Sequence, residues 1–80
     1  MEREKAISVV KEIFDKCNLI EGKAIKLMPP DANNVLSNGC QIHIESRNDT
    51  HLEKCLKTIA SSKSLAFAKE GEQVIIYKSR

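Results

Sequence analysis

The chain has 80 residues and a formal net charge of +2, with 41% hydrophobic and 30% charged residues. A chain of this length builds one hydrophobic core, so we expect a single domain over residues 1–80. Its composition is that of a globular protein rather than a disordered tail. No apolar run approaches the roughly 18 residues that a membrane span needs, and no long basic run marks nucleic acid as a partner.

Three cysteines, Cys17, Cys40 and Cys55, form an odd set without a C-x-x-C motif. This pattern favours reduced thiols over the disulfide framework of a small secreted protein. We expect the three to be small apolar residues of the core. The first ten residues lack the apolar stretch of a signal peptide, so the sequence predicts a cytoplasmic protein.

The first predicted element is an amphipathic helix over Glu2–Asn18. At helical spacing, one broad stripe gathers Ala6, Val9, Val10, Ile13, Phe14 and Cys17, with Ile7 at its edge. Two strands follow, over Lys23–Met28 and Cys40–Ser46. In the second strand Cys40, Ile42 and Ile44 alternate with Gln41, His43 and Glu45, which predicts one buried and one open face.

A second helix is predicted over Thr50–Ser62. Thr50 and Glu53 have the spacing of a capping box, and one helix face gathers the apolar residues Leu52, Cys55, Leu56, Ile59 and Ala60. The last two strands, Leu65–Lys69 and Gln73–Lys78, flank Glu70-Gly71-Glu72 and predict a β-hairpin.

The order αββαββ predicts an α+β two-layer sandwich, with two helices on one face of a four-stranded, mainly antiparallel sheet. Moving the last strand to the front gives the order of a ferredoxin-like fold, so a circularly permuted version with sheet order 3-4-2-1 is one solution. Pairing of hairpins in another order is the alternative. The expected core is made of Ile13, Phe14, Ile25, Ile42, Ile44, Leu56 and Ile59.

The connection Pro29–Gly39 is long for so small a domain and has two interpretations. Pro30 can begin a single helical turn that tucks Val35 and Leu36 onto the core. Alternatively, the loop presents a ligand-binding cluster of hydrogen-bonding side chains, because binding residues concentrate on loops held by a rigid scaffold. The candidate residues of this cluster are Asp31, Asn33, Asn34, Ser37 and Asn38.

Four residues, Cys40, His43, His51 and Cys55, have side chains of the types that bind zinc. Cys40 and His43 point to opposite faces of the predicted strand, however, so they do not converge on one metal. We therefore expect no metal and no cofactor. No nucleophile, base and orienting group converge either, and we expect a protein that is not an enzyme.

The sheet face opposite the helices is the candidate interface. Val74–Tyr77 is apolar on both sides of its strand, and two helices cover only one face of a sheet. The candidate interface residues are Lys26, Gln41, His43, Ile75 and Tyr77, with His43 also a candidate for ligand binding. The sequence thus favours a small-molecule-binding or protein-interaction module, with a homodimer through this face as one form of it. The alternative is a nucleic-acid-binding domain that uses the same face.

Overall fold

The computed structural model describes residues 1–17, 25–28 and 37–79, apart from the side chains of residues 37 and 38. Within these residues, two helices and four strands follow one another. They are α1 (Arg3–Lys16), β1 (Ile25–Met28), β2 (Ser37–Glu45), α2 (Thr50–Ser62), β3 (Ala66–Glu70) and β4 (Gln73–Ser79).

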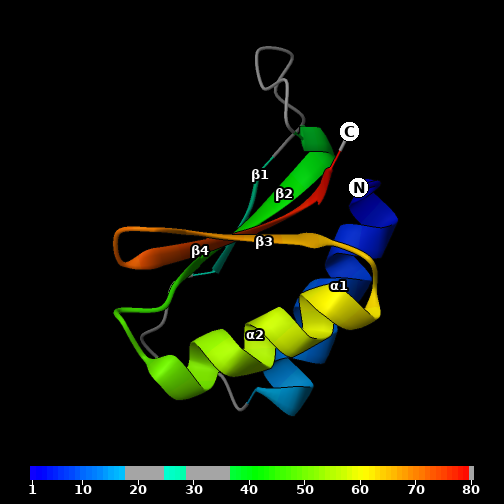
Figure 1. Cartoon of the computed structure of the whole chain (residues 1–80). Coiled ribbons are helices and arrows are strands. Elements are labelled where there is room, and N and C mark those ends of the chain that lie inside the picture. The colour runs from blue at the N-terminus through cyan, green and yellow to red at the C-terminus, as the bar shows by residue number, and fades with distance from the viewer. Residues whose placement is uncertain (18–24, 29–36, 80) are drawn as a thin grey trace.

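The strands form one antiparallel sheet in the order β1-β2-β4-β3, which reads 3-4-2-1 from the opposite edge. Figure 1 shows both helices on the same side of this sheet, and no described helix or strand covers the other side. The predicted α+β class, with two helices packed on one face of a four-stranded antiparallel sheet, is confirmed. The circular permutation stays an interpretation.

The core lies between the helices and the sheet. Alternation along β2 and β4 sends Ile42, Ile44, Val74 and Ile76 to the helix side, where all four are fully buried. Ile13, Leu56 and Ile59 meet them from the helices, as predicted, and Ile25 packs at the edge of this cluster.

Phe14 is the exception in the predicted core. It is 49% exposed, whereas its neighbour Ile13 is fully buried. The prediction that Phe14 belongs to the core is therefore wrong. The buried stripe of α1 is narrower than its apolar stripe and consists of Ala6, Val9 and Ile13, because the helix rests on the sheet along one line of contact.

Helix α2 has the predicted bounds, but its cap is one residue earlier than the capping box implied. Asp49 is the N-cap, and its Oδ1 accepts a hydrogen bond of 3.1 Å from the backbone N–H of Leu52. Glu53 lies in the first turn and forms a 2.9 Å ion pair with Lys69 of β3. Asp is among the best N-cap residues, so it takes this place ahead of Thr50.

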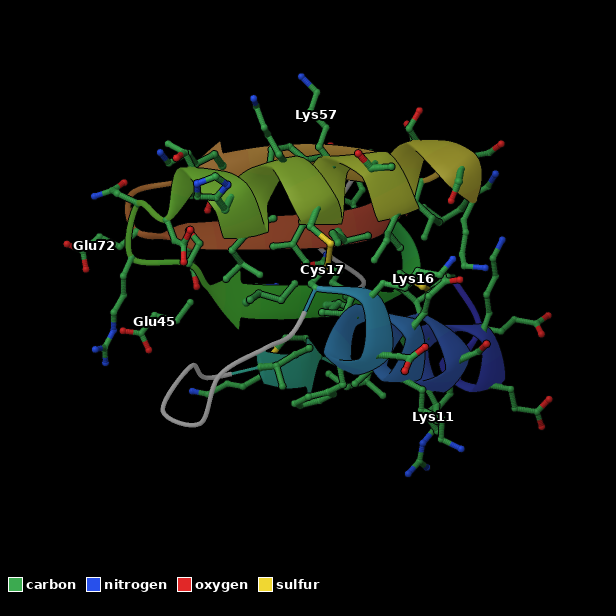
Figure 2. All side chains as sticks on the ribbon, turned by 90° about the horizontal axis from the view of Figure 1, so that it is seen from below. Lys11, Lys16, Cys17, Glu45, Lys57 and Glu72 are labelled. Carbon is green, nitrogen blue, oxygen red and sulfur yellow. A yellow bond between two sulfur atoms is a disulfide. The ribbon has the colours of Figure 1, made fainter. Side chains whose placement is uncertain are left out.

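A covalent bond joins the two helices. Cys17, at the C-terminal end of α1, forms a disulfide with Cys55 in the middle of α2. The sulfur atoms lie between the helices in Figure 2. The prediction of three free thiols is wrong for these two cysteines, whereas Cys40 is a buried free thiol. The two cysteines are 38 residues apart in the sequence, so their pairing depends on how the helices pack. The spacing of residues within one helix does not predict that packing.

The second strand begins earlier than predicted. β2 starts at Ser37, which pairs with Ser79, and the register then shifts before Gln41 pairs with Tyr77. At this irregularity the backbone N–H of Cys40 donates a 2.7 Å hydrogen bond to the carbonyl of Met1. Met1 thus accepts a backbone hydrogen bond at the point where the pairing of β2 with β4 is interrupted, and its side chain is buried there.

Within the described residues, neither helix has the length and apolar character required to cross a membrane.

Candidate functional site

The predicted loop cluster does not come together as one described site. Asp31, Asn33 and Asn34 lie outside the described residues, so their predicted role in ligand binding stays a prediction. Ser37 and Asn38 belong to strand β2, not to a loop. The prediction that they lie on the connection Pro29–Gly39 is therefore wrong, because the ladder with β4 extends three residues further toward the N-terminus than the apolar alternation indicated.

The candidate interface residues, by contrast, lie on one surface. The strand register aligns the side chains that point away from the helices in three rows across the sheet, and we call this surface the open face. Its first row is Met28, Gln41, Tyr77 and Ala66; its second is Lys26, His43, Ile75 and Ala68; its third is Glu45, Gln73 and Glu70.

A hydrogen bond between two polar side chains occupies the β2 part of the open face. Gln41 Oε1 lies 3.0 Å from His43 Nε2. Because an amide oxygen can only accept, this contact is a hydrogen bond when His43 Nε2 carries a proton. Gln41 is only 7% exposed, since Met28 and Tyr77 flank it in the first row.

His43 itself is half-buried at the middle of the second row, between Lys26 and Ile75. Burial lowers the pKa of the imidazole below its usual value, and nearby Lys26 lowers it further, while Glu70 opposes the shift. The imidazole is therefore more readily neutral in the folded protein than in the unfolded chain.

Among the described residues, the charged side chains of the open face lie at its rim. Lys26 lies on edge strand β1 and Glu70 on the opposite edge strand β3, and both are exposed. Neither side chain takes part in an ion pair within the described part of the chain. Glu45 is held by Arg47, whose Nε lies 3.1 Å from Glu45 Oε1. The centre of the face is consequently neutral, with Ile75 and Tyr77 as its largest apolar surfaces.

The four residues of zinc-binding type are dispersed. Cys55 is bonded to Cys17, Cys40 is buried on the helix side of β2, and His43 lies on the open face. His51 is exposed at the start of α2. Among the described residues, no three side chains of His, Cys, Asp or Glu are placed to hold a metal ion.

Comparison of the chain with protein-family models, with curated proteins and with solved structures finds no match. The fold and the open face therefore carry the functional argument by themselves.

Sequence reasoning overlooked two polar residues of the open face, Gln73 and Glu70. Both sit at the hairpin of β3 and β4, where Glu70 pairs directly with Gln73. The prediction placed Glu70 in the turn, although a two-residue Gly71-Glu72 turn makes Glu70 the last residue of β3. The glycine in that turn was the signal available, because two-residue turns with a left-handed first residue are common in hairpins.

Proposed function

We propose that this protein is a non-enzymatic interaction module that self-associates through the open face. The observation that supports the proposal is a sheet face with both described helices on its other side, whose half-buried centre combines apolar side chains on β4 with a hydrogen-bonded polar pair on β2. Ile75, Tyr77 and Met28 provide the apolar surface, and the Gln41–His43 hydrogen bond already satisfies two of the polar groups there. Covering a face of this kind costs little free energy, because few unpaired polar groups must be desolvated.

The size of the face limits the affinity. Four strands about 4.8 Å apart and five residues of about 3.4 Å give a footprint of roughly 300 Å². Stable complexes bury about 800 Å² on each partner, so the open face alone supports a weak, reversible dimer. Self-association should therefore be measured from about 10 µM to about 1 mM.

The decisive variant is Ile75→Glu, which places a carboxylate at the centre of the open face. We expect it to weaken dimerisation at least tenfold, because a buried unpaired charge costs more than about 1.4 kcal/mol. The measurement is sedimentation equilibrium, with circular dichroism to show that the variant is folded.

The matched control is Ile7→Glu, which makes the same chemical change at an isoleucine of α1 that is 38% exposed. This variant should dimerise as the parent does. Equal dimerisation of the parent and Ile75→Glu would contradict the proposal, as would a parent that stays monomeric at the highest concentration.

Binding of nucleic acid to the same face has less support. Lys26 and Tyr77 are suited to phosphate and base contacts, but the third row adds the carboxylates of Glu45 and Glu70. Negative charge on the binding surface opposes a polyanion.

The predicted cytoplasmic location stays a prediction. Free thiols no longer support this location, because Cys17 and Cys55 form a disulfide and disulfides persist mainly in oxidising compartments.

A further inference from the structure

The open face is complementary to a second copy of itself in one particular orientation. This inference rests on the proposed self-association and adds to it the direction of the symmetry axis and the pair of residues that sets it. Face-to-face sheets pack about 10 Å apart with their strands aligned within about 30°, and a homodimer of this kind has a twofold axis lying between the two sheets. The axis can run along the strands or across them.

An axis along the strands, between β2 and β4, keeps each row against the same row of the second copy and reverses the strand order. Each residue then meets the residue at the mirrored position of its own row. Large side chains on β1 face small ones on β3, because Met28 meets Ala66 and Lys26 meets Ala68. Gln41 likewise lies opposite Tyr77, and Glu45 lies opposite Gln73.

This orientation also brings opposite charges together. Glu70 is two residues from Ala68 on β3, so it lies one row from the position that Lys26 faces. Residues two apart on a strand are separated by about 7 Å, and a lysine side chain spans nearly that distance. The small Ala68 leaves room for the lysine to lie along the face toward Glu70. Each dimer then contains two such pairs.

An axis across the strands gives the opposite result. Every strand then meets its own copy, and the second row meets itself in the same order. Lys26 faces Lys26, Ala68 faces Ala68, and Glu70 faces Ala66. Like charges meet, and small residues oppose small residues, which leaves a gap.

We propose that two copies of this chain associate through their open faces about a twofold axis parallel to the strands, with Lys26 of each copy paired to Glu70 of the other. The exposed lysine and the exposed glutamate, each without an ion-pair partner among the described residues, are the recognition elements of this dimer.

Charge reversal tests this orientation by sedimentation equilibrium of the full chain. Lys26→Glu and Glu70→Lys should each weaken dimerisation roughly 5- to 30-fold, because each introduces two repulsive contacts per dimer. The double variant Lys26→Glu/Glu70→Lys should return to within about threefold of the parent, since the pairs are restored with reversed polarity. An equimolar mixture of the two single variants should form a heterodimer, because both of its cross-pairs are attractive.

The controls reproduce the change in net charge on the helix layer. Lys57→Glu on α2 and Asp15→Lys on α1 alter exposed residues and should leave dimerisation within about twofold of the parent. Figure 2 shows Lys57 pointing away from the body of the molecule.

The outcomes separate the orientation from the proposed function. A parent that dimerises and loses dimerisation in Ile75→Glu, but is unaffected by Glu70→Lys, retains the proposed function and overturns the orientation. Failure of the double variant to recover also overturns it. A parent that remains monomeric up to about 1 mM overturns both.

Discussion

Gly39 is the residue at which the N-terminus of the chain meets the sheet. Its φ of +80° lies in the left-handed region, and a Cβ at this position would overlap the backbone of Met1. The Met1 amine donates a 3.4 Å hydrogen bond to the carbonyl of Cys40, and burial lowers the pKa of this amine. Glycine is therefore required here for two reasons, the backbone conformation and the close approach of a second segment.

We expect Gly39→Ala to lower the free energy of unfolding by about 2 to 4 kcal/mol, because strain at positive φ adds to the displacement of Met1. Gly71→Ala is the matched control. Gly71 also has a positive φ, of +61°, but a Cβ there would meet no atom within 4 Å. It should cost only about 1 kcal/mol. Urea unfolding of both variants measures the difference, and equal losses would show that the contact with Met1 contributes nothing.

Phe14 shows that the apolar character of a side chain does not by itself decide whether it is buried. Its ring lies within the apolar stripe of α1, yet half of it is exposed while the smaller Ala6 and Val9 are fully buried. The line of contact between helix and sheet decides which part of the stripe is buried. That line depends on the sheet, which lies elsewhere in the sequence.

At the scale of elements, the two helices depend on each other and on the sheet. Helices of 14 and 13 residues are marginal in isolation, so their stability comes from tertiary packing. The Cys17–Cys55 disulfide links them, and Glu12 of α1 contacts Lys63 at the end of α2 at 3.3 Å. The disulfide is the larger contribution, because partly exposed ion pairs add little.

Reduction of the disulfide should lower the free energy of unfolding by about 2 to 4 kcal/mol, since a bridge across 38 residues restricts the unfolded chain. The double variant Cys17→Ser/Cys55→Ser should show the same loss. Thermal unfolding with and without a phosphine reductant measures the effect.

The control is the double variant itself, whose melting temperature should not respond to the reductant. Alkylation of the unfolded, unreduced parent followed by mass spectrometry should find one free thiol, that of Cys40. Three alkylated cysteines would show that the bridge does not form.

At the scale of the whole molecule, we expect the proposed self-association through the open face to depend on pH. Among the described residues, the titratable groups around His43 are Lys26 on β1, Glu45 on its own strand, Tyr77 on β4 and Glu70 on β3. Burial already lowers the pKa of His43 in the monomer, and covering the face buries the ring further. A group whose pKa falls on association binds protons better in the free state, so protonation opposes the dimer.

We therefore expect dimerisation to be fully present above about pH 7 and to weaken as the pH falls from about 6.5 to 5. The same argument applies to folding. Because the pKa of His43 is lower in the folded monomer than in the unfolded chain, protonation of this residue below about pH 6.5 lowers the free energy of unfolding. Sedimentation equilibrium across this range measures the dimer.

His43→Gln should remove most of this pH dependence, whereas His51→Gln should retain it, because His51 is exposed on α2. The chain has only these two histidines, so the pair of variants is a complete comparison. An unchanged pH profile in His43→Gln would assign the dependence to the carboxylates instead.

The sequence by itself determined the elements and the faces they present. Helical periodicity located α2 at Thr50–Ser62, and strict alternation assigned Ile42 and Ile44 to the core and His43 to the opposite side. Both results follow from the fixed periods of helix and strand, which are properties of the local backbone. The hairpin of β3 and β4 could be predicted from the glycine in its turn, because the backbone conformation of a tight turn is also a local property.

The tertiary structure decided everything that joins distant segments. Cys17 pairs with Cys55, Met1 docks at Gly39, and Lys26, His43, Ile75 and Ala68 align in one row only once all four strands are in register. Contacts between residues far apart in sequence depend on strand order, register and helix placement. These are set by the packing of the whole core, and no local pattern in the chain encodes them.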